Sequence, residues 1–284
     1  MSLKGKNALV TGGSRGIGKS IAEALAHEGC NLVLISRTKS ELADAKAELS
    51  VIGPKVEIAA LDVSDTSAAD EIKKEIERVF PEGLDILVTA AGIYGPMGLV
   101  HEVSAEEWRK AIEINLFGTF AAIQAAVPFM QKRGGGKIIT FSGGGEGAYP
   151  RFSSYVAGKG GVVRLTETLA KELAEYHIDI NAIAPGAVNT KFLDELLAAG
   201  PEKVGNETYY ISLKQKEGGG VLPDKAAELV LFLASSASDG ISGKVISAVH
   251  DAYKDFPKHK DDIMKSDVYN FRRIKPKDRG FNWV

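Results

Sequence analysis

The sequence predicts an α/β protein: one domain built on a doubly wound parallel sheet of about seven strands, with an extended C-terminal tail. Short runs rich in leucine and β-branched residues alternate with longer amphipathic runs. This alternation is typical of parallel strands joined by right-handed helical crossovers, with helices on both faces of the sheet. The chain has 284 residues and no evident linker, which fits one large domain.

The first half of the chain is expected to hold four strand–helix pairs. A strand is expected where a short apolar run is bounded by polar residues, and a helix where apolar residues recur at helical spacing. In chain order the expected elements are strand 7–10, helix 17–28, strand 31–35, helix 39–49, strand 56–60, helix 68–80, strand 84–89 and helix 105–131.

The second half continues the alternation with one long interruption. The expected elements are strand 137–141, helix 154–175, strand 178–184, helix 225–233 and strand 244–249. Residues 191–222 carry helical pieces but no strand. An insertion of this length after the carboxyl end of a strand is typical of a lid or substrate loop. We therefore expect a catalytic domain over residues 1–250, with 191–222 as its substrate loop.

The tail, residues 251–284, is polar but aromatic. Its basic residues are simplest to interpret as a solvated surface: Arg272, Arg273, Lys275, Lys277 and Arg279. Its aromatic residues indicate packing rather than disorder: Tyr253, Phe256, Tyr269, Phe271, Phe281 and Trp283. We expect the tail to pack on the same domain or on a neighbouring subunit.

The composition limits the classes of binding partner and the cellular compartments that we expect for this protein. A net charge of -2 gives the molecule no electrostatic reason to bind nucleic acid. The single cysteine, Cys30, allows no intrachain disulfide and indicates a reducing compartment. We find no apolar run of spanning length and no apolar signal core, so we expect no membrane partner and a cytoplasmic location. The histidines lack ligand spacing, so we expect no metal.

A glycine-rich turn joins the first strand to the first helix. It reads Thr11-Gly12-Gly13-Ser14-Arg15-Gly16-Ile17-Gly18. Glycines let the backbone approach a phosphate closely, and the helix N-terminus supplies free N–H groups. The spacing is neither the usual G-x-G-x-x-G nor a Walker loop. A tight turn without a ligand is the alternative, but the strand–helix repeat that follows favours a dinucleotide phosphate site.

The residues at the end of the second strand, Ser36-Arg37-Thr38, indicate whether the chain prefers NAD(H) or NADP(H). A ribose 2′-hydroxyl is usually bound there by a carboxylate, and a 2′-phosphate by arginine. No carboxylate stands at this point, and Arg15 adds a second positive charge. The sequence therefore favours NADP(H) over NAD(H), the alternative being that Arg37 simply faces solvent.

A serine, a tyrosine and a lysine form the candidate reaction site. Tyr155 and Lys159 lie four residues apart and so share one face of a helix. Ser142, thirteen residues upstream of Tyr155, ends a strand. An ammonium beside a phenol lowers the pKa of the phenol and suits it to proton transfer. An isolated Tyr-x-x-x-Lys is usually ordinary surface, but the serine and the phosphate loop favour a catalytic interpretation.

Together these motifs resemble the short-chain dehydrogenase/reductase family over about residues 5–250. The resemblance implies a Rossmann-like fold and hydride transfer between a nicotinamide and a ketone or secondary alcohol. Tyr155 would be the general acid/base, Ser142 would bond the carbonyl oxygen, and Lys159 would hold the nicotinamide ribose. Asn115 would hold a water that relays protons. Implied cofactor contacts are Gly12, Ser14, Arg15, Gly16, Ile17, Gly18, Arg37, Asp62, Val63, Ala91, Gly92, Tyr155, Lys159, Pro185, Gly186, Val188 and Thr190.

The chain departs from the family pattern in two places. Thr89-Ala90 stands where the family usually has two asparagines, and His250-Asp251 where many members have two glycines. The substrate end is therefore the part that the resemblance describes least. The residues expected to line it are Tyr94, Met97, Glu146, Tyr149, Arg151 and Phe192. This mixture leaves open a general ketone, a sugar or polyol, and a 3-oxoacyl thioester.

Other functions and the assembly also follow from these patterns. A cofactor-binding scaffold without catalysis is the second hypothesis, although the intact Ser142, Tyr155, Lys159 and Asn115 argue against it. A sugar-nucleotide epimerase is disfavoured by length and glycine spacing. Helices 105–131 and 154–175 should present apolar faces that one domain does not cover, and the resemblance implies a homodimer or homotetramer.

Overall fold

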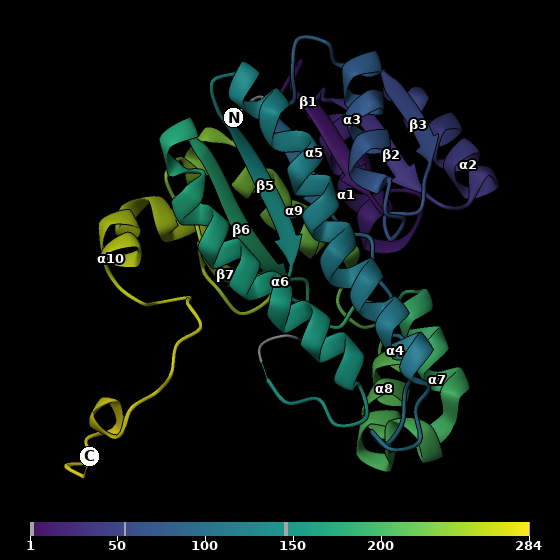
Figure 1. Ribbon diagram of the computed structural model, residues 1–284, viewed down its shortest axis with the longest axis vertical. Coiled ribbons are helices and arrows are strands. Elements are labelled where there is room, and N and C mark those ends of the chain that lie inside the picture. Colours follow the sequence, from purple (N-terminus) through teal and green to yellow (C-terminus); the bar gives the residue numbers. More distant parts are fainter. Residues whose placement is uncertain (1–2, 54, 145–146, 284) are drawn as a thin grey trace.

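The computed structural model describes residues 3–53, 55–144 and 147–283. It confirms the predicted fold class. Seven parallel strands form one sheet in the order β3-β2-β1-β4-β5-β6-β7, with helices on both faces (Figure 1). The strands are β1 Asn7–Thr11, β2 Asn31–Ser36, β3 Val56–Ala60, β4 Ile86–Thr89, β5 Gly136–Phe141, β6 Ile178–Ala184 and β7 Val245–Ser247.

The direction in which strands are added reverses between β1 and β4. In an open parallel sheet this reversal leaves a crevice beyond the carboxyl ends of the strands, where ligands bind. The register there is set by Val10, which pairs with Leu34 on one side and with Val88 on the other. The fold therefore places the end of β1, and the glycine-rich turn after it, at the crevice.

Two apolar cores cover the two faces of the sheet. Successive strand residues point to opposite faces, so Val10 lies in one core and Leu9 in the other. The first core contains residues of α1 Gly16–His27, α2 Lys39–Ser50 and α9 Pro223–Ala234. The second contains residues of α3 Ala68–Val79, α5 Gly118–Lys132 and α6 Ser153–Glu172.

The expected continuous helix 105–131 is interrupted. It consists of α4 Ala105–Ile112, a π-helical turn Glu113–Phe117, and α5. Single π turns inside α-helices often occur at functional sites. This one carries Asn115, whose side chain is fixed to the backbone of Ile93. The side-chain bonds explain why the helix widens here, and no residue pattern in the sequence indicates it.

The same helical stretch, Ala105–Arg133, is long and apolar enough to cross a membrane by length and composition. From the sequence, no stretch of spanning length is expected. In the structure α5 packs against α3 and the sheet, and Ala122, Ile123 and Ala126 are buried. Its apolar character therefore belongs to the core of the domain.

The segment 191–222, expected from the sequence to be a substrate loop, folds into α7 Lys191–Val204 and α8 Asn206–Glu217. Gly200, at φ 79°, kinks α7 just before Pro201. The bridge between Val188 and Val221 joins the two ends of the segment. Helical pieces without a strand are therefore confirmed. Figure 1 shows α7 and α8 together with α4 beyond one end of the sheet.

The tail packs on its own domain as far as Phe271. Tyr253 and Phe256 are buried in the core beneath α9. Lys244, almost fully buried, donates hydrogen bonds to the carbonyl oxygens of Ser266 and Val268 at 3.2 and 3.0 Å. Phe271 still donates its N–H to the Glu167 carboxylate of α6 at 2.7 Å, and the last part of the chain, towards the C-terminus, runs away from the body (Figure 1). The tail is thus an anchored segment followed by a projecting arm, residues 272–283. The remaining short elements are α10 Lys260–Lys265 and the 3₁₀ turns Ala174–Tyr176, Ser236–Ser238, Tyr253–His259 and Pro276–Arg279.

Candidate active site

A cleft of about 830 Å³ lies at the carboxyl ends of the strands. It brings together all the residues that the sequence analysis assigns to the cofactor, from Gly12 in the first turn to Thr190 after β6. These residues come from the ends of β1, β2, β3, β4 and β6 and from α6. The cleft therefore has the position and the lining expected of a dinucleotide site.

The glycine-rich turn is packed too closely for side chains. A Cβ atom at Gly12 would lie 2.7 Å from the backbone nitrogen of Ala91, and one at Gly18 would lie 2.2 Å from the carbonyl oxygen of Gly12. Gly12 and Gly16 also have positive φ angles, 70° and 54°. A backbone this close to its neighbours leaves its surface free for a phosphate. Ala90 fits the same arrangement, because its Cβ lies 3.4 Å from where a Gly18 Cβ would be.

The end of β2 holds the groups that would meet an adenosine ribose. The Ser36 hydroxyl oxygen is buried and has no hydrogen-bond partner among the described residues. Arg37 lines the cleft, and its guanidinium lies 3.8 Å from the Asp62 carboxylate. Burial alone raises the pKa of Asp62, but the hydrogen bonds from Ser64 and the nearby positive charges outweigh it and lower that pKa. The unpaired Ser36 hydroxyl and the guanidinium of the next residue, Arg37, are groups that could bind a ribose phosphate.

Glu41 is a charged residue of the cleft that the sequence does not indicate. The Glu41 carboxylate accepts hydrogen bonds from Ser14 at 3.3 Å, Arg15 at 3.2 Å and Lys191 at 3.0 Å. The hydrogen bond from Lys191 is the main reason that the pKa of Glu41 is lowered. Glu41 thus joins the glycine-rich turn to the first residue of α7. Its only sequence signal is an acid in the first turn of a helix, which is common everywhere.

The candidate reacting groups belong to the same cleft. Tyr155 and Lys159 both line it and are both buried. Burial lowers the pKa of Lys159 to about 8. The sequence predicts that Lys159 lowers the pKa of Tyr155, but burial raises that pKa, and the hydrogen bond with the Gly144 backbone offsets this only in part. Burial, with a smaller contribution from the nearby Tyr149 phenol, therefore sets the direction of this pKa.

Asn115 is placed beside Lys159 rather than in the cleft. Its side-chain oxygen accepts from the Ile93 N–H at 3.1 Å, and its amide donates to the Ile93 carbonyl at 2.8 Å. A Cβ at Gly92 would lie 2.8 Å from that Asn115 oxygen and 3.6 Å from the Lys159 nitrogen. Asn115 therefore fixes the strand-end loop against which Lys159 packs.

Ser142 is fully buried at the end of β5 and does not line the cleft. Its hydroxyl donates to the carbonyl oxygen of Ile183 at 3.2 Å. Its neighbours Gly143 and Gly144 do line the cleft beside Tyr155. The serine is therefore next to the reaction site, with its hydroxyl directed to β6.

Of the six residues expected at the substrate end, three line the cleft. Tyr94, Tyr149 and Phe192 line the cleft. Met97 instead packs against the aromatic cluster. Arg151 turns away to donate to the carbonyl oxygen of Glu202 at 2.8 Å, near the end of α7. The remaining expected residue, Glu146, lies outside the described residues.

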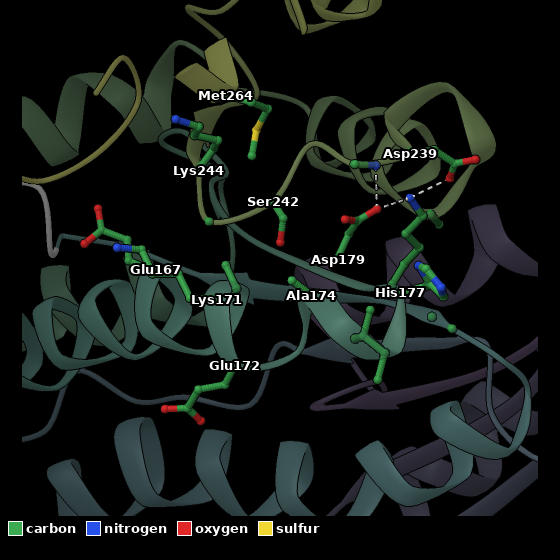
Figure 2. A pocket seen from close by; sticks show the side chains of 18 of the residues that line it. Glu167, Lys171, Glu172, Ala174, His177, Asp179, Asp239, Ser242, Lys244 and Met264 are labelled. Atoms are coloured by element: carbon green, nitrogen blue, oxygen red, sulfur yellow. Dashed lines mark hydrogen bonds and ion pairs between the residues drawn. The ribbon is translucent and has the colours of Figure 1, made fainter. Parts of the chain in front are cut away.

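A larger hollow of about 1550 Å³ lies at the opposite, amino ends of the strands. Figure 2 shows Asp179 and Asp239 on one side of it, with Glu167 and Lys171 of α6 on another. Its partly buried Lys137 is paired: the ammonium lies 2.7 Å from the carboxylate of Asp179 and 2.8 Å from that of the exposed Asp239. Within the described part of the chain no cluster of three or more His, Cys, Asp or Glu could hold a metal. The glycine-rich turn and the Tyr155–Lys159 pair line the smaller cleft instead.

The chain is similar to known proteins in sequence and in fold. Residues 6–199 match the family described as short chain dehydrogenase. The 3-oxoacyl-[acyl-carrier-protein] reductase of Thermotoga maritima is 36% identical over 250 residues, 87% of this chain and 97% of that one. The 2,3-dihydro-2,3-dihydroxybenzoate dehydrogenase of Bacillus subtilis is 34% identical over 84% and 93%. The structure of carveol dehydrogenase from Mycobacterium avium in complex with NAD superposes with a TM-score of 0.75 at 28% identity, covering 86% and 96%.

Proposed function

Since the chain belongs to the short-chain dehydrogenase/reductase family of oxidoreductases, which act on CH–OH and carbonyl groups, we propose that it is an NADP(H)-dependent ketone reductase or secondary-alcohol dehydrogenase. Tyr155 is its general acid/base. The observation that carries the proposal is one cleft with a glycine-rich phosphate cradle at one end and the buried Tyr155–Lys159 pair at the other. Consumption of NADPH with a panel of ketones tests it.

Different residues along the cleft bind different parts of the cofactor and the substrate. The glycine-rich turn would bind the pyrophosphate, Arg15 and Arg37 a 2′-phosphate, and Lys159 the nicotinamide ribose. The chemistry that a bound nicotinamide supplies is hydride transfer to or from carbon. Tyr155 gives its phenolic proton to the carbonyl oxygen in reduction and takes it back in oxidation. Ser142 stabilises the charge on that oxygen, a role that requires its hydroxyl to leave the Ile183 carbonyl.

The preference for NADP(H) rests on charge. Arg15 and Arg37 line the adenosine end, and Arg37 follows β2 where an NAD site usually has a carboxylate. Carveol dehydrogenase, which this chain resembles, is known in complex with NAD. The fold therefore does not decide the cofactor, and the proposal depends on these two arginines.

Replacing Arg37 by Gln should lower kcat/KM for NADPH by about 10- to 100-fold, because a charge-assisted phosphate bond contributes about 1.5–3 kcal/mol. The value for NADH should change little. Steady-state kinetics with both cofactors measures this, with Arg78→Gln on the outer surface of α3 as the matched control. Equal kcat/KM values for NADH and NADPH in the wild-type protein would refute the proposed preference for NADP(H).

We further propose a cytoplasmic homodimer or homotetramer. Phe117, on the π turn, leaves 59% of its surface exposed, and Phe120, on α5, leaves 42%. This exposure of two large apolar side chains is what a surface covered by another subunit would show. The projecting arm 272–283 also exposes Phe281 and Trp283. Light scattering should show an oligomer that becomes smaller when the chain is truncated after Phe271; a full-length monomer contradicts the assembly.

A further inference from the structure

We infer that the substrate is a ketone or secondary alcohol on an apolar ring, alicyclic or aromatic, with no charge close to the reacting carbon. This inference rests on the proposed function and names the class of molecule that the same site accepts. Its basis is the difference between the two halves of the cleft. The half around Tyr155 is walled by rings, and the half around Arg37 is walled by charges.

The walls of the reaction half are aromatic and meet at Tyr155. The ring of Tyr94 lies edge-on to the ring of Tyr155, with centroids 4.9 Å apart, and is 4.8 Å from the ring of Phe192. Tyr149 stacks at 4.1 Å on Phe152, which is completely buried. Rings held on both sides by other rings are rigid, so they present flat surfaces of fixed spacing to a ligand.

The floor of this half is aliphatic. Leu193 and Leu196 of α7 line the cleft and are themselves almost fully buried. Burial raises the pKa of both Tyr94 and Tyr149, so their phenols stay neutral. An apolar ring that enters between these walls loses no hydrogen bonds and exchanges water contact for packing.

The polar side chains of the cleft are largely engaged within the protein. Outside the proposed cofactor site, the described polar lining residues include Ser212, Gln215, Ser247, His250 and Asp251. The Asp251 carboxylate accepts from the Ser247 N–H at 2.6 Å, and the Ser247 hydroxyl accepts from the His250 N–H at 3.1 Å. Gln215 already donates to the Asn189 side chain at 3.2 Å. A keto sugar would bury several hydroxyls here, and each buried hydroxyl without a partner costs free energy. The site therefore disfavours sugars and polyols.

Three basic groups near this half are already engaged, which disfavours an anionic carrier. Lys191 is held by Glu41, and Lys216 by Asp194. Arg151 is directed to a carbonyl oxygen at the end of α7. A phosphate-bearing thioester arm would need to displace these partners to be neutralised. The neutral, ring-lined half of the cleft matches an uncharged cyclic ketone better.

The test compares NADPH oxidation with tetralone, xylulose and acetoacetyl-N-acetylcysteamine on the full-length protein. We expect kcat/KM for tetralone to exceed that for xylulose by at least about 100-fold, and to exceed that for the thioester. Greater efficiency with xylulose or the thioester overturns the ring-ketone inference and leaves the proposed function standing. No turnover of any ketone, by protein that still binds NADPH in a fluorescence titration, contradicts the proposed function itself.

Variants of Phe192 test whether the aromatic wall of the cleft is responsible for the preference for tetralone. Phe192→Ala should raise KM for tetralone by at least about tenfold while kcat changes less, and Phe192→Leu should give an intermediate value. Saturation-transfer NMR with tetralol and NADP⁺ should lose its signal in Phe192→Ala. Tyr176→Ala, an exposed aromatic residue after α6, is the control. Unchanged KM and NMR signal in a Phe192→Ala protein with a normal melting curve overturn the inference.

Discussion

Replacing Tyr155 by Phe is expected to lower kcat by at least about 1,000-fold while NADPH binding persists. General acid catalysis by a positioned side chain contributes about 100- to 10,000-fold, and no other phenol in the described cleft lies on the helix face that carries Lys159. The ring itself remains, so its edge contact with Tyr94 and its place in the cluster are kept. Stopped-flow reduction of a ketone measures the loss, and a fluorescence titration measures cofactor affinity.

The matched control is Tyr253→Phe. Tyr253 is also a buried tyrosine, but it lies in the core beneath α9 and not in the cleft. Removing its hydroxyl should leave kcat within about twofold, because surface and core changes remote from the reacting atoms act through stability. Near-normal turnover in Tyr155→Phe would refute the proposed proton donor, whatever the control shows.

The sheet and the phosphate cradle could be predicted because their signals are local. Apolar runs fix the strands, and the spacing of Gly12, Gly16 and Gly18 has few uses other than a tight strand–helix turn. Tyr155 and Lys159 are likewise brought together by helical spacing alone. These features need no knowledge of what packs against them, so the sequence is sufficient.

The parts that could not be predicted depend on long-range contacts. The π turn at Asn115 arises because its side chain bonds Ile93, twenty-two residues away. Glu41 becomes a cleft residue only because Lys191, 150 residues later, begins α7 beside it. The pKa of Tyr155 was predicted in the wrong direction because the depth of burial is a property of the whole fold. Sequence patterns name residue types at such points but not their surroundings.

Lys159→Met should abolish turnover and at the same time stabilise the protein. Burial lowers the pKa of this lysine from 10.5 to about 8, and no carboxylate among the described residues compensates its charge. At about 1.4 kcal/mol per pKa unit, holding the buried ammonium charged costs about 3 kcal/mol. Methionine keeps most of the apolar stem and removes the charge, so the free energy of unfolding at pH 7 should rise by up to about this amount.

The pH dependence of this gain has a definite sign. Below pH 8 the lysine is charged in both the folded and the unfolded protein, so the full cost is present and methionine has its whole advantage. Between pH 8 and 10.5 the folded lysine is neutral while the unfolded one still binds a proton, so the wild-type protein gains stability with rising pH. The difference between the two proteins should therefore shrink through this window. Urea unfolding at several pH values measures it, with Lys171→Met, an exposed lysine on the same helix, as control. A Lys159→Met protein that is less stable than wild type at pH 7 would show that another group of the folded protein neutralises the Lys159 ammonium. The catalytic role proposed for Lys159 would then need another source of positive charge.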